Sequence, residues 1–297
     1  MQSVTLHGVD MDPLYFLEQN YNQYVATFRS PGGKLPEMMA LKLHHTEEVV
    51  RNAALIAEGE RFGALESFTA KAAALLHDTG RYEQLKRYAT FRDSDSVDHA
   101  VFSYDIVRSE GWLSSLDEAS FPQEELSCVG GLDGVIEAVE SAVLWHNRRE
   151  VPPQKDASER TSLIHLAAHT VRDADKLDIF RVLEERIKST DWRKERTAFW
   201  NLSPDEKPSA EIISALKNGD SVDYNSIRSL SDFILIQVGW MICGLHFETS
   251  RKLCRERGHL SFRRSFLKEL TDCPVIDEVC DIAEKSLSAA FVQSISS

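Results

Sequence analysis

The sequence predicts an all-α protein, and three observations lead to that fold class. Apolar residues in nearly every long segment of the 297-residue chain recur with helical spacing. Convincing strand signals, in which apolar and polar residues alternate, are absent from the sequence. The breaks between segments carry the Gly, Pro, Asp and Ser that are typical of loops. We therefore expect helices joined by loops.

The expected helices follow one another without an internal repeat, a low-complexity tract or an interdomain linker. This organisation predicts one all-helical domain over residues 1–297, with the C-terminal third packed onto the rest. The predicted helices lie at roughly 11–29, 36–60, 66–79, 98–110, 132–147, 161–189, 191–201, 209–217, 226–256, 260–270 and 275–294.

The composition is that of a soluble globular protein, with 42% hydrophobic and 27% charged residues. A formal net charge of −13 argues against general nucleic-acid binding, which depends on clustered Lys and Arg. No signal peptide is visible, and the most apolar run, at 233–247, falls short of the roughly twenty residues that span a membrane. Scattered cysteines without C-x-x-C indicate reduced thiols. We therefore expect a cytoplasmic protein that contacts no membrane.

The helix at 36–60 carries a histidine where an apolar residue is expected. In "LKLHHTEEVVRNAALIA" the apolar stripe consists of Leu41, Val49, Ala53 and Ile56. The member of the stripe four residues after Leu41 is His45. This spacing predicts that the imidazole of His45 points inward.

The helix at 66–79 ends in a His-Asp pair. In "AAALLHDTGRYEQ" five apolar residues run into His77 and Asp78, and Gly80 follows. A C-terminal cap explains the imidazole and the glycine, because cations suit the negative end of the helix dipole and Gly ends helices. A carboxylate at that end is unfavourable. Asp78 is therefore expected to have another partner.

Two further helices also carry histidine on their buried faces. In "DHAVFSYDIV" the side chain of His99 shares a face with Phe102 and Ile106. In "LDGVIEAVESAVLWHN" the apolar stripe ends on His146. That stripe consists of Leu132, Ile136, Val139 and Val143.

In "LIHLAAHTVRDADKLDIFRV" the apolar stripe passes through two acidic residues, Asp175 and Asp178. The stripe itself consists of Ile164, Ala168, Val171 and Val182. Asp178 lies close to one turn after Asp175, where it can orient a ligand or a water, or pair with Lys176 or Arg181.

The same helix holds a second pair of candidates, His165 and His169, whose i, i+4 spacing could clamp a metal. Their face continues into Arg172 and Lys176, and the glutamate of H-E-x-x-H is missing. Two cations beside a site oppose a divalent ion, so we expect no metal role for this pair.

Each inward His or Asp has an ordinary explanation when it is taken alone, such as a hydrogen bond to a backbone carbonyl or a helix cap. Together they are harder to explain, because each buried polar group costs about 1–3 kcal/mol unless it finds a partner. One divalent metal satisfies several of them at once, and imidazole with carboxylate is a standard ligand set. A metal site is therefore favoured, and its candidates in chain order are His45, His77, Asp78, His99, His146 and Asp175.

The ordered set H…HD…D resembles the HD superfamily of metal-dependent phosphohydrolases. The matching pieces are "HHTEEVV", "LLHDTGRYEQ" and "RDADKLDIF", and "DHAVFSYDIV" and "VLWHNRREVP" look like intermediate histidine motifs of members with an enlarged site. The similarity covers residues 40–180 or thereabouts. It implies an HD-domain-like helical bundle, followed by additional C-terminal helices over about 181–297.

The resemblance also implies a ligand set. His45, His77, Asp78 and Asp175 correspond to the primary ligands, and Asp78 would bridge two ions where two are present. His99 and His146 would hold a second ion or, in single-metal relatives, contact phosphate. The expected cofactor is one or two divalent ions per chain, of Mn, Fe, Co, Ni, Zn or Mg.

The chemistry that the resemblance implies is hydrolysis of a phosphate ester or nucleotide by a metal-activated water. Asp78 and Arg81 are the catalytic candidates, because Arg81 follows the ligands by three residues and can neutralise phosphate charge. The sequence contains no P-loop and no G-x-S-x-G. Two alternatives stay open: a di-iron oxygenase built on the HD fold, and a metal-containing ligand sensor without hydrolysis.

Overall fold

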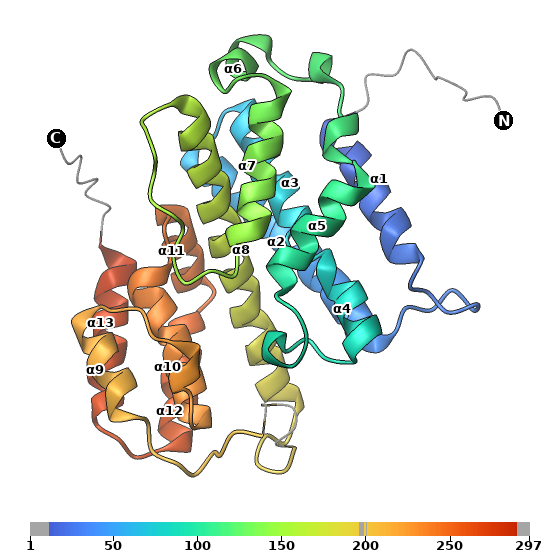
Figure 1. Cartoon of the computed structure of the whole chain (residues 1–297). Coiled ribbons are helices and arrows are strands. Elements are labelled where there is room, and N and C mark those ends of the chain that lie inside the picture. Colours follow the sequence, from blue (N-terminus) through green and yellow to red (C-terminus); the bar gives the residue numbers. More distant parts are fainter. Residues whose placement is uncertain (1–11, 196–198, 200, 290–297) are drawn as a thin grey trace. The chain divides into compact units, whose positions relative to one another are not determined.

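The structure is a computed structural model that describes residues 12–195, 199 and 201–289. Within those residues the regular elements are helices, and an isolated bridge joins Ser203 to Ser229. The predicted all-α fold is confirmed (Figure 1). By its internal contacts the chain divides into two compact units, Met1–Val171 and Arg172–Ser297, and the boundary falls inside one long helix. The expectation of one domain stays a prediction.

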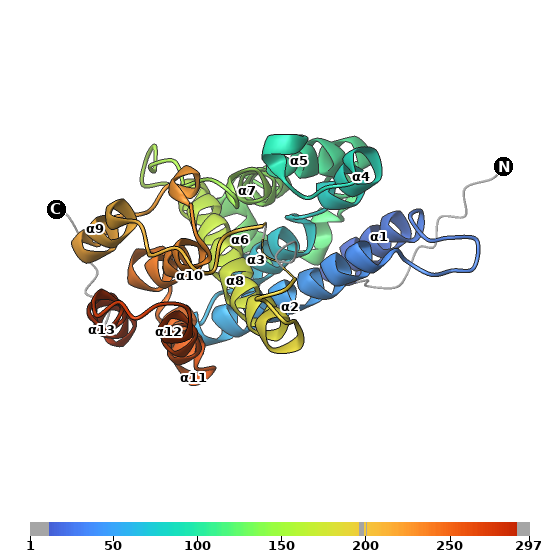
Figure 2. The same cartoon turned by 90° about the horizontal axis from the view of Figure 1, so that it is seen from below.

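The first unit is built around α3. This helix packs against α1, α2 and α7, and α5 packs on both α4 and α7 (Figures 1 and 2). The helices of this unit are α1 (Pro13–Ala26), α2 (Glu37–Glu60), α3 (Ala64–Leu76), α4 (Gly80–Tyr88), α5 (His99–Glu110), α6 (Gln123–Cys128), α7 (Leu132–Trp145) and the first part of α8 (Glu159–Ser189).

The central position of α3 follows from its composition. Its last turns are the run "AAALL", and every residue from 72 to 76 is buried. A helix that is apolar all round is stable only when neighbours cover all of its faces. The small alanine side chains also favour the helical conformation itself. The end of α3 therefore delivers the two residues that follow it, His77 and Asp78, into the interior.

The predicted stripe of α2 is confirmed over most of its length. Val49, Ala53 and Ile56 are fully buried, and His45 is buried with them. Leu41 was expected in the same stripe, but half of its surface (50%) is exposed. The stripe therefore begins one turn later than the sequence predicted, at His45.

Two helices occupy segments in which loops were expected. One is the short α6, and the other is α4, whose first residue is Gly80, the residue that was expected to end a helix. Glu83 forms ion pairs with Lys86 and Arg87 across one turn of α4, and such pairs support a polar helix. Tyr82, on the same helix, is buried. Tertiary packing therefore overrides the loop-like composition of this segment.

Among its described residues, the second unit contains the rest of α8 and five further α-helices. These are α9 (Ala210–Asn218), α10 (Leu230–Gly239), α11 (Glu248–Glu256), α12 (His259–Leu270) and α13 (Val275–Ser288). Within the described part of this unit, α10 contacts α9, α12 and α13.

The single helix predicted over 226–256 is wrong. α10 continues into a π-helical turn, Trp240–Gly244, and the chain then leaves the helical conformation before α11. The carboxylate of Asp173 accepts hydrogen bonds from the backbone N–H groups of His246 and Phe247 at 2.9–3.0 Å. These bonds stabilise the break, because they satisfy the backbone N–H groups of Phe247, the N-cap of α11, and of the residue before it.

The helix predicted at 191–201 is also wrong over its described N-terminal part, since residues 192–194 form a turn. Residues 196–198 and 200, and the predicted helix ends at 11 and 290–294, lie outside the described residues. Among the helices that the structure describes, none is both long and apolar enough to cross a membrane.

A buried ionic cluster holds α8, α10 and α12 of the second unit together. Arg263 is fully buried and donates hydrogen bonds to Glu184 Oε1 at 2.7 Å and to Gln237 Oε1 at 2.6 Å. His259 Nδ1 lies 2.6 Å from Glu184 Oε1. Burial raises the pKa of Glu184, but His259 and Arg263 outweigh it, so that this pKa lies below its usual value. Buried ionic and hydrogen-bonded side chains therefore connect these three helices.

Candidate metal centre

The turn between α3 and α4 places Asp78 beside α5. Gly80 donates its backbone N–H to Ser103 Oγ at 2.9 Å. A Cβ atom added to Gly80 would lie 2.7 Å from the backbone nitrogen of Ser103, so a larger residue does not fit. Gly80 is therefore a contact residue between α4 and α5 rather than a cap for α3.

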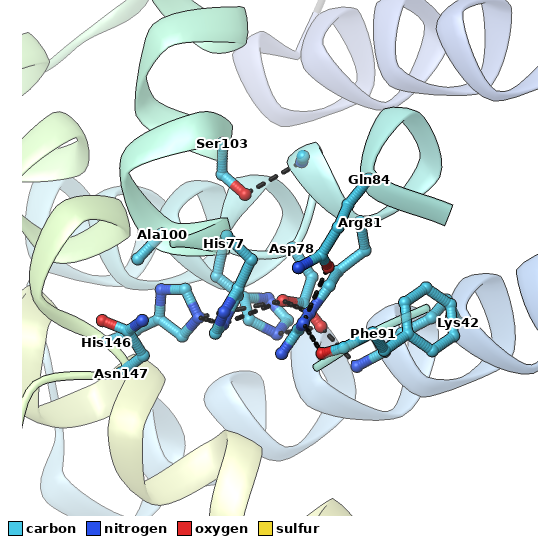
Figure 3. A network of polar contacts seen from close by, with 12 residues as sticks. Lys42, His77, Asp78, Arg81, Gln84, Phe91, Ala100, Ser103, His146 and Asn147 are labelled. Atoms are coloured by element: carbon cyan, nitrogen blue, oxygen red, sulfur yellow. Dashed lines mark hydrogen bonds and ion pairs between the residues drawn. The ribbon is translucent and has the colours of Figure 1, made fainter. Parts of the chain in front are cut away.

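The carboxylate of Asp78 is the centre of the cluster (Figure 3). Asp78 is buried, with 4% of its surface exposed, and lies between imidazoles on one side and Lys42 on the other. Its Oδ2 atom lies 3.7 Å from His45 Nε2 and 3.5 Å from His77 Nε2. Its Oδ1 atom lies 3.6 Å from His99 Nε2 and 3.8 Å from His146 Nε2. Each oxygen thus faces its own pair of histidines.

The hydrogen bonds of the outer ring nitrogens fix three of these imidazoles. His77 and His146 each direct Nδ1 at the backbone carbonyl three residues earlier, at 2.7 Å in both cases. His99 directs Nδ1 at the carboxylate of Asp93 at 2.5 Å. Carbonyl and carboxylate oxygens only accept, so Nδ1 carries the proton in all three rings. In the neutral form of each ring Nε2 then carries a lone pair, and all three Nε2 atoms lie 3.5–3.8 Å from an oxygen of Asp78.

These lone pairs fit a cation. The Nε2 atoms of His99 and His146 are only 2.9 Å apart. Two neutral imidazoles whose Nδ1 atoms are both protonated present two acceptors to each other at that distance, which is repulsive. A proton or a metal ion between them removes the repulsion, and neutral imidazole with carboxylate is the ligand chemistry of divalent transition metals. The donor set therefore fits the metal that the sequence predicted.

Two groups of potential ligands share Asp78. The first group is His45, His77 and Asp78, and the second is Asp78, His99 and His146. Within each group the potential ligand atoms lie within 4.8 Å of one another. One carboxylate between two such groups can contact an ion with each of its oxygens. A third group found among the described residues, Asp93, Asp98 and His99, is less buried.

Asp98 ties the two helices that carry His99 and His146 together. It is the N-cap of α5 and accepts the N–H groups of residues 100 and 101 through Oδ1. The same carboxylate accepts hydrogen bonds from Asn147 at 3.0 Å and from Arg148 at 2.6 Å, just after α7. Its hydrogen bonds thus fix the spacing of the two histidines.

Arg81 also contacts the carboxylate of Asp78, because its Nε atom donates to Oδ1 at 3.3 Å. Its Nη1 atom donates to Gln84 at 2.8 Å, to the carbonyl of Phe91 at 2.6 Å and to Asp93 at 3.0 Å. These contacts hold a guanidinium in one orientation at the cluster, as the spacing from the His-Asp pair suggested.

Lys42 belongs to the site but was missed in the sequence. Its Nζ atom donates to Asp78 Oδ2 at 2.6 Å. Burial raises the pKa of Asp78, but Lys42, followed by His77 and Arg81, holds that pKa well below its usual value. The available signal was position, because a residue three before His45 lies on the same helix face.

Asp93 was also missed. It lies in a short 3₁₀ turn, Asp93–Asp95, in which the sequence suggested only a loop. Burial raises its pKa, but the hydrogen bond and charge of His99, with Arg81, lower it to about 2. Helical periodicity could not identify Asp93, because it lies outside the long helices. Its role depends on a turn that brings it back to His99 at the start of α5.

Asp175 and Asp178, the two acidic residues predicted in the stripe of α8, lie in the second unit. Asp178 is buried and pairs with Arg181 at 2.7 Å, one of the two partners considered for it. Asp175 is only half-buried, and its charge adds to the effect of burial in raising the pKa of Tyr224. Its role as a ligand stays a prediction. Val182, expected in the buried stripe of this helix, is 42% exposed.

His165 and His169 lie in the first unit, with their ring centroids 6.1 Å apart. They belong to none of the groups of three or more potential ligands found among the described residues. The structure therefore brings together five of the six predicted ligands, with Arg81 beside them: His45, His77, Asp78, His99 and His146.

Comparison with known protein families gives one result for this chain. Residues 43–179 match the family model described as HD domain. No curated protein and no solved structure matches the chain. The matched residues begin two positions before His45 and end four positions after Asp175, so they include all six predicted ligands.

Proposed function

Because the chain belongs to the HD superfamily through residues 43–179, we propose that it is a metal-dependent phosphohydrolase. The observation that carries the proposal is the shared carboxylate of Asp78, toward which the Nε2 atoms of four buried histidines converge. A structural salt bridge requires one such partner, whereas a pair of metal positions requires several.

The two oxygens of Asp78 suggest how two divalent ions are held. Oδ2 with His45 and His77 would form the first position, and Oδ1 with His99 and His146 would form the second. Asp175 is the expected further ligand of the first position. When bound, such ions lower the pKa of water from about 15.7 toward 7 and polarise a phosphoryl oxygen.

The residues around the ligands prepare the site for an anion. Asp93 keeps the proton of His99 on Nδ1, which leaves Nε2 as the ligand atom. Arg81 is fixed beside Asp78 by Gln84, Asp93 and the carbonyl of Phe91, so its charge is in place before substrate arrives. A guanidinium held in this way orients and neutralises a phosphate group. We propose a small phosphorylated compound as substrate, with nucleotides among the first to be tested.

The decisive experiment is metal analysis of the untagged protein, followed by a screen against nucleotides and phosphate esters. We expect about two ions per chain, and hydrolysis that disappears when the metal is removed. His77→Ala and Asp78→Ala should lose metal. His99→Ala or His146→Ala should reduce the content from about two ions to about one.

Two matched controls come from the same unit. His165→Ala and His169→Ala remove imidazoles outside the two ligand groups, so their metal content should equal that of the wild type. Full metal retention in His77→Ala would show that the site is wrongly assigned. Iron-dependent oxygen consumption without hydrolysis would identify an oxygenase instead. A full metal complement with no turnover of any phosphate ester would favour a ligand sensor.

A further inference from the structure

Lys42 occupies the side of Asp78 that faces the first metal position. It lies on α2 one turn before His45, and its Nζ atom is 2.6 Å from Asp78 Oδ2. The same oxygen faces His45 Nε2 at 3.7 Å and His77 Nε2 at 3.5 Å. An ammonium group therefore stands against the oxygen that belongs to the first ligand group.

An ammonium and a divalent ion compete for this oxygen. Both are cations, and in a buried site their repulsion is screened far less than in water. Because of this repulsion, we expect the contact between Lys42 and Asp78 to lengthen or break when an ion binds Oδ2. Asp78 itself has little freedom to move away, because its Oδ1 atom is held at 3.3 Å by Arg81.

The side chain of Lys42 can move away from Asp78 toward solvent. It is 22% exposed, and its flexible four-carbon stem allows the ammonium to move outward. The ring of Phe91 lies beside it, with Lys42 Nζ 5.8 Å from the ring centroid. The guanidinium carbon of Arg81 is also 5.8 Å from the same centroid. Both cations thus lie close to one aromatic ring next to Asp78 (Figure 3).

We propose that Lys42 is an exchangeable counter-ion of Asp78. In the metal-free protein it neutralises Oδ2 of the buried carboxylate. Once an ion occupies the first position, the ammonium group of Lys42 turns away from Oδ2. It then joins Arg81 in binding the phosphate group of the substrate. This inference rests on the proposed function, because it requires both a metal at Asp78 and a phosphorylated ligand.

The first measurement is calorimetric titration of the full-length metal-free protein with Mn²⁺ alone. Lys42→Met keeps the apolar stem and removes the charge. We expect it to bind the first ion about tenfold more tightly than the wild type, because a charge-assisted contact no longer has to be broken. Lys42→Arg keeps a cation at the same position and should stay within about threefold of the wild type. Lys86→Met removes an exposed lysine of α4 that pairs with Glu83, and should leave Mn²⁺ affinity unchanged.

The second measurement uses the Mn²⁺-loaded protein and inorganic phosphate, so no turnover is involved. Lys42→Met should bind phosphate about tenfold more weakly, the loss expected for one hydrogen bond to a charged group. Lys86→Met again serves as the control. The opposite signs of the two effects distinguish an exchanging lysine from a residue that merely orders the site, which would weaken both.

The outcomes separate this inference from the proposed function. If the wild type binds no Mn²⁺, both fail. If the wild type binds Mn²⁺ but Lys42→Met binds it equally or less tightly, only the exchange is overturned. Unchanged phosphate affinity in Lys42→Met would equally overturn the second half of the inference. Melting curves show whether Lys42→Met folds, and Lys42→Gln, which also removes the charge, supplies the test if it does not.

Discussion

Replacing Gly80 with alanine should loosen the junction that joins the His-Asp pair to α5. The added Cβ atom would lie 2.7 Å from the backbone nitrogen of Ser103 and 3.0 Å from the carbonyl carbon of Phe102. Ordinary contacts of this kind begin at 3.4 Å, so the two helices must separate by several tenths of an ångström. Both neighbours are backbone atoms, which cannot move aside as a side chain can.

The magnitude of the destabilisation follows from two costs and one gain. Overpacking of a buried contact costs about 1–3 kcal/mol, and stretching the bond from Gly80 to Ser103 Oγ weakens an interaction of about 0.5–1.5 kcal/mol. Alanine recovers up to about 1 kcal/mol of helix propensity. We expect the free energy of unfolding to fall by about 1–3 kcal/mol.

The assay is urea unfolding followed by far-UV circular dichroism, with Gly59→Ala as the matched control. Gly59 is an exposed residue of α2, so the same substitution there should stabilise the helix by up to about 1 kcal/mol. Ser103 lies one turn after His99 on α5, so Gly80→Ala should also weaken binding of the ion at His99. If both alanine variants are equally stable and Gly80→Ala binds metal like the wild type, the packing argument is refuted.

Two further predictions concern carboxylates outside the ligand groups that share Asp78. Asp93→Ala removes the acceptor that keeps the proton of His99 on Nδ1, and should lower Mn²⁺ affinity about 10–100-fold in calorimetry; unchanged affinity would rule out this orienting role. Glu184→Gln leaves Arg263 buried without its carboxylate and should destabilise the protein by about 3–5 kcal/mol at pH 7. The pKa of Glu184 is lowered on folding, so its contribution is present above its unfolded pKa of about 4.3 and is lost below it. In urea unfolding the difference from wild type should therefore shrink on acidification, and a constant difference down to pH 3 would contradict the assignment.

The helical content of the protein was readable from the sequence, because helix formation depends largely on local spacing. The same spacing indicated His45 and His146, each of which stands at an apolar position of its own helix and is buried in the structure. The pattern also showed that Asp78 at the end of an apolar helix required a partner. These inferences need only the 3.6-residue period and the energetic penalty for burying a polar group.

Element boundaries were less predictable, since packing decides them. Gly80 was expected to end a helix, yet it begins one, because only a glycine allows α4 to approach the backbone of α5 so closely. The break after α10 depends on Asp173, a residue more than seventy positions earlier in the chain. Neither contact has a local signature.

The ligand candidates and the chemistry they suggest came from the sequence alone, whereas the way in which they meet came from tertiary structure. Which oxygen of Asp78 faces which histidine, and the proximity of His99 to His146, depend on how α2, α3, α5 and α7 pack. Lys42 and Asp93 join the site for the same reason. Periodicity identifies the face of a helix on which a side chain lies, but only the packed structure determines what that face meets.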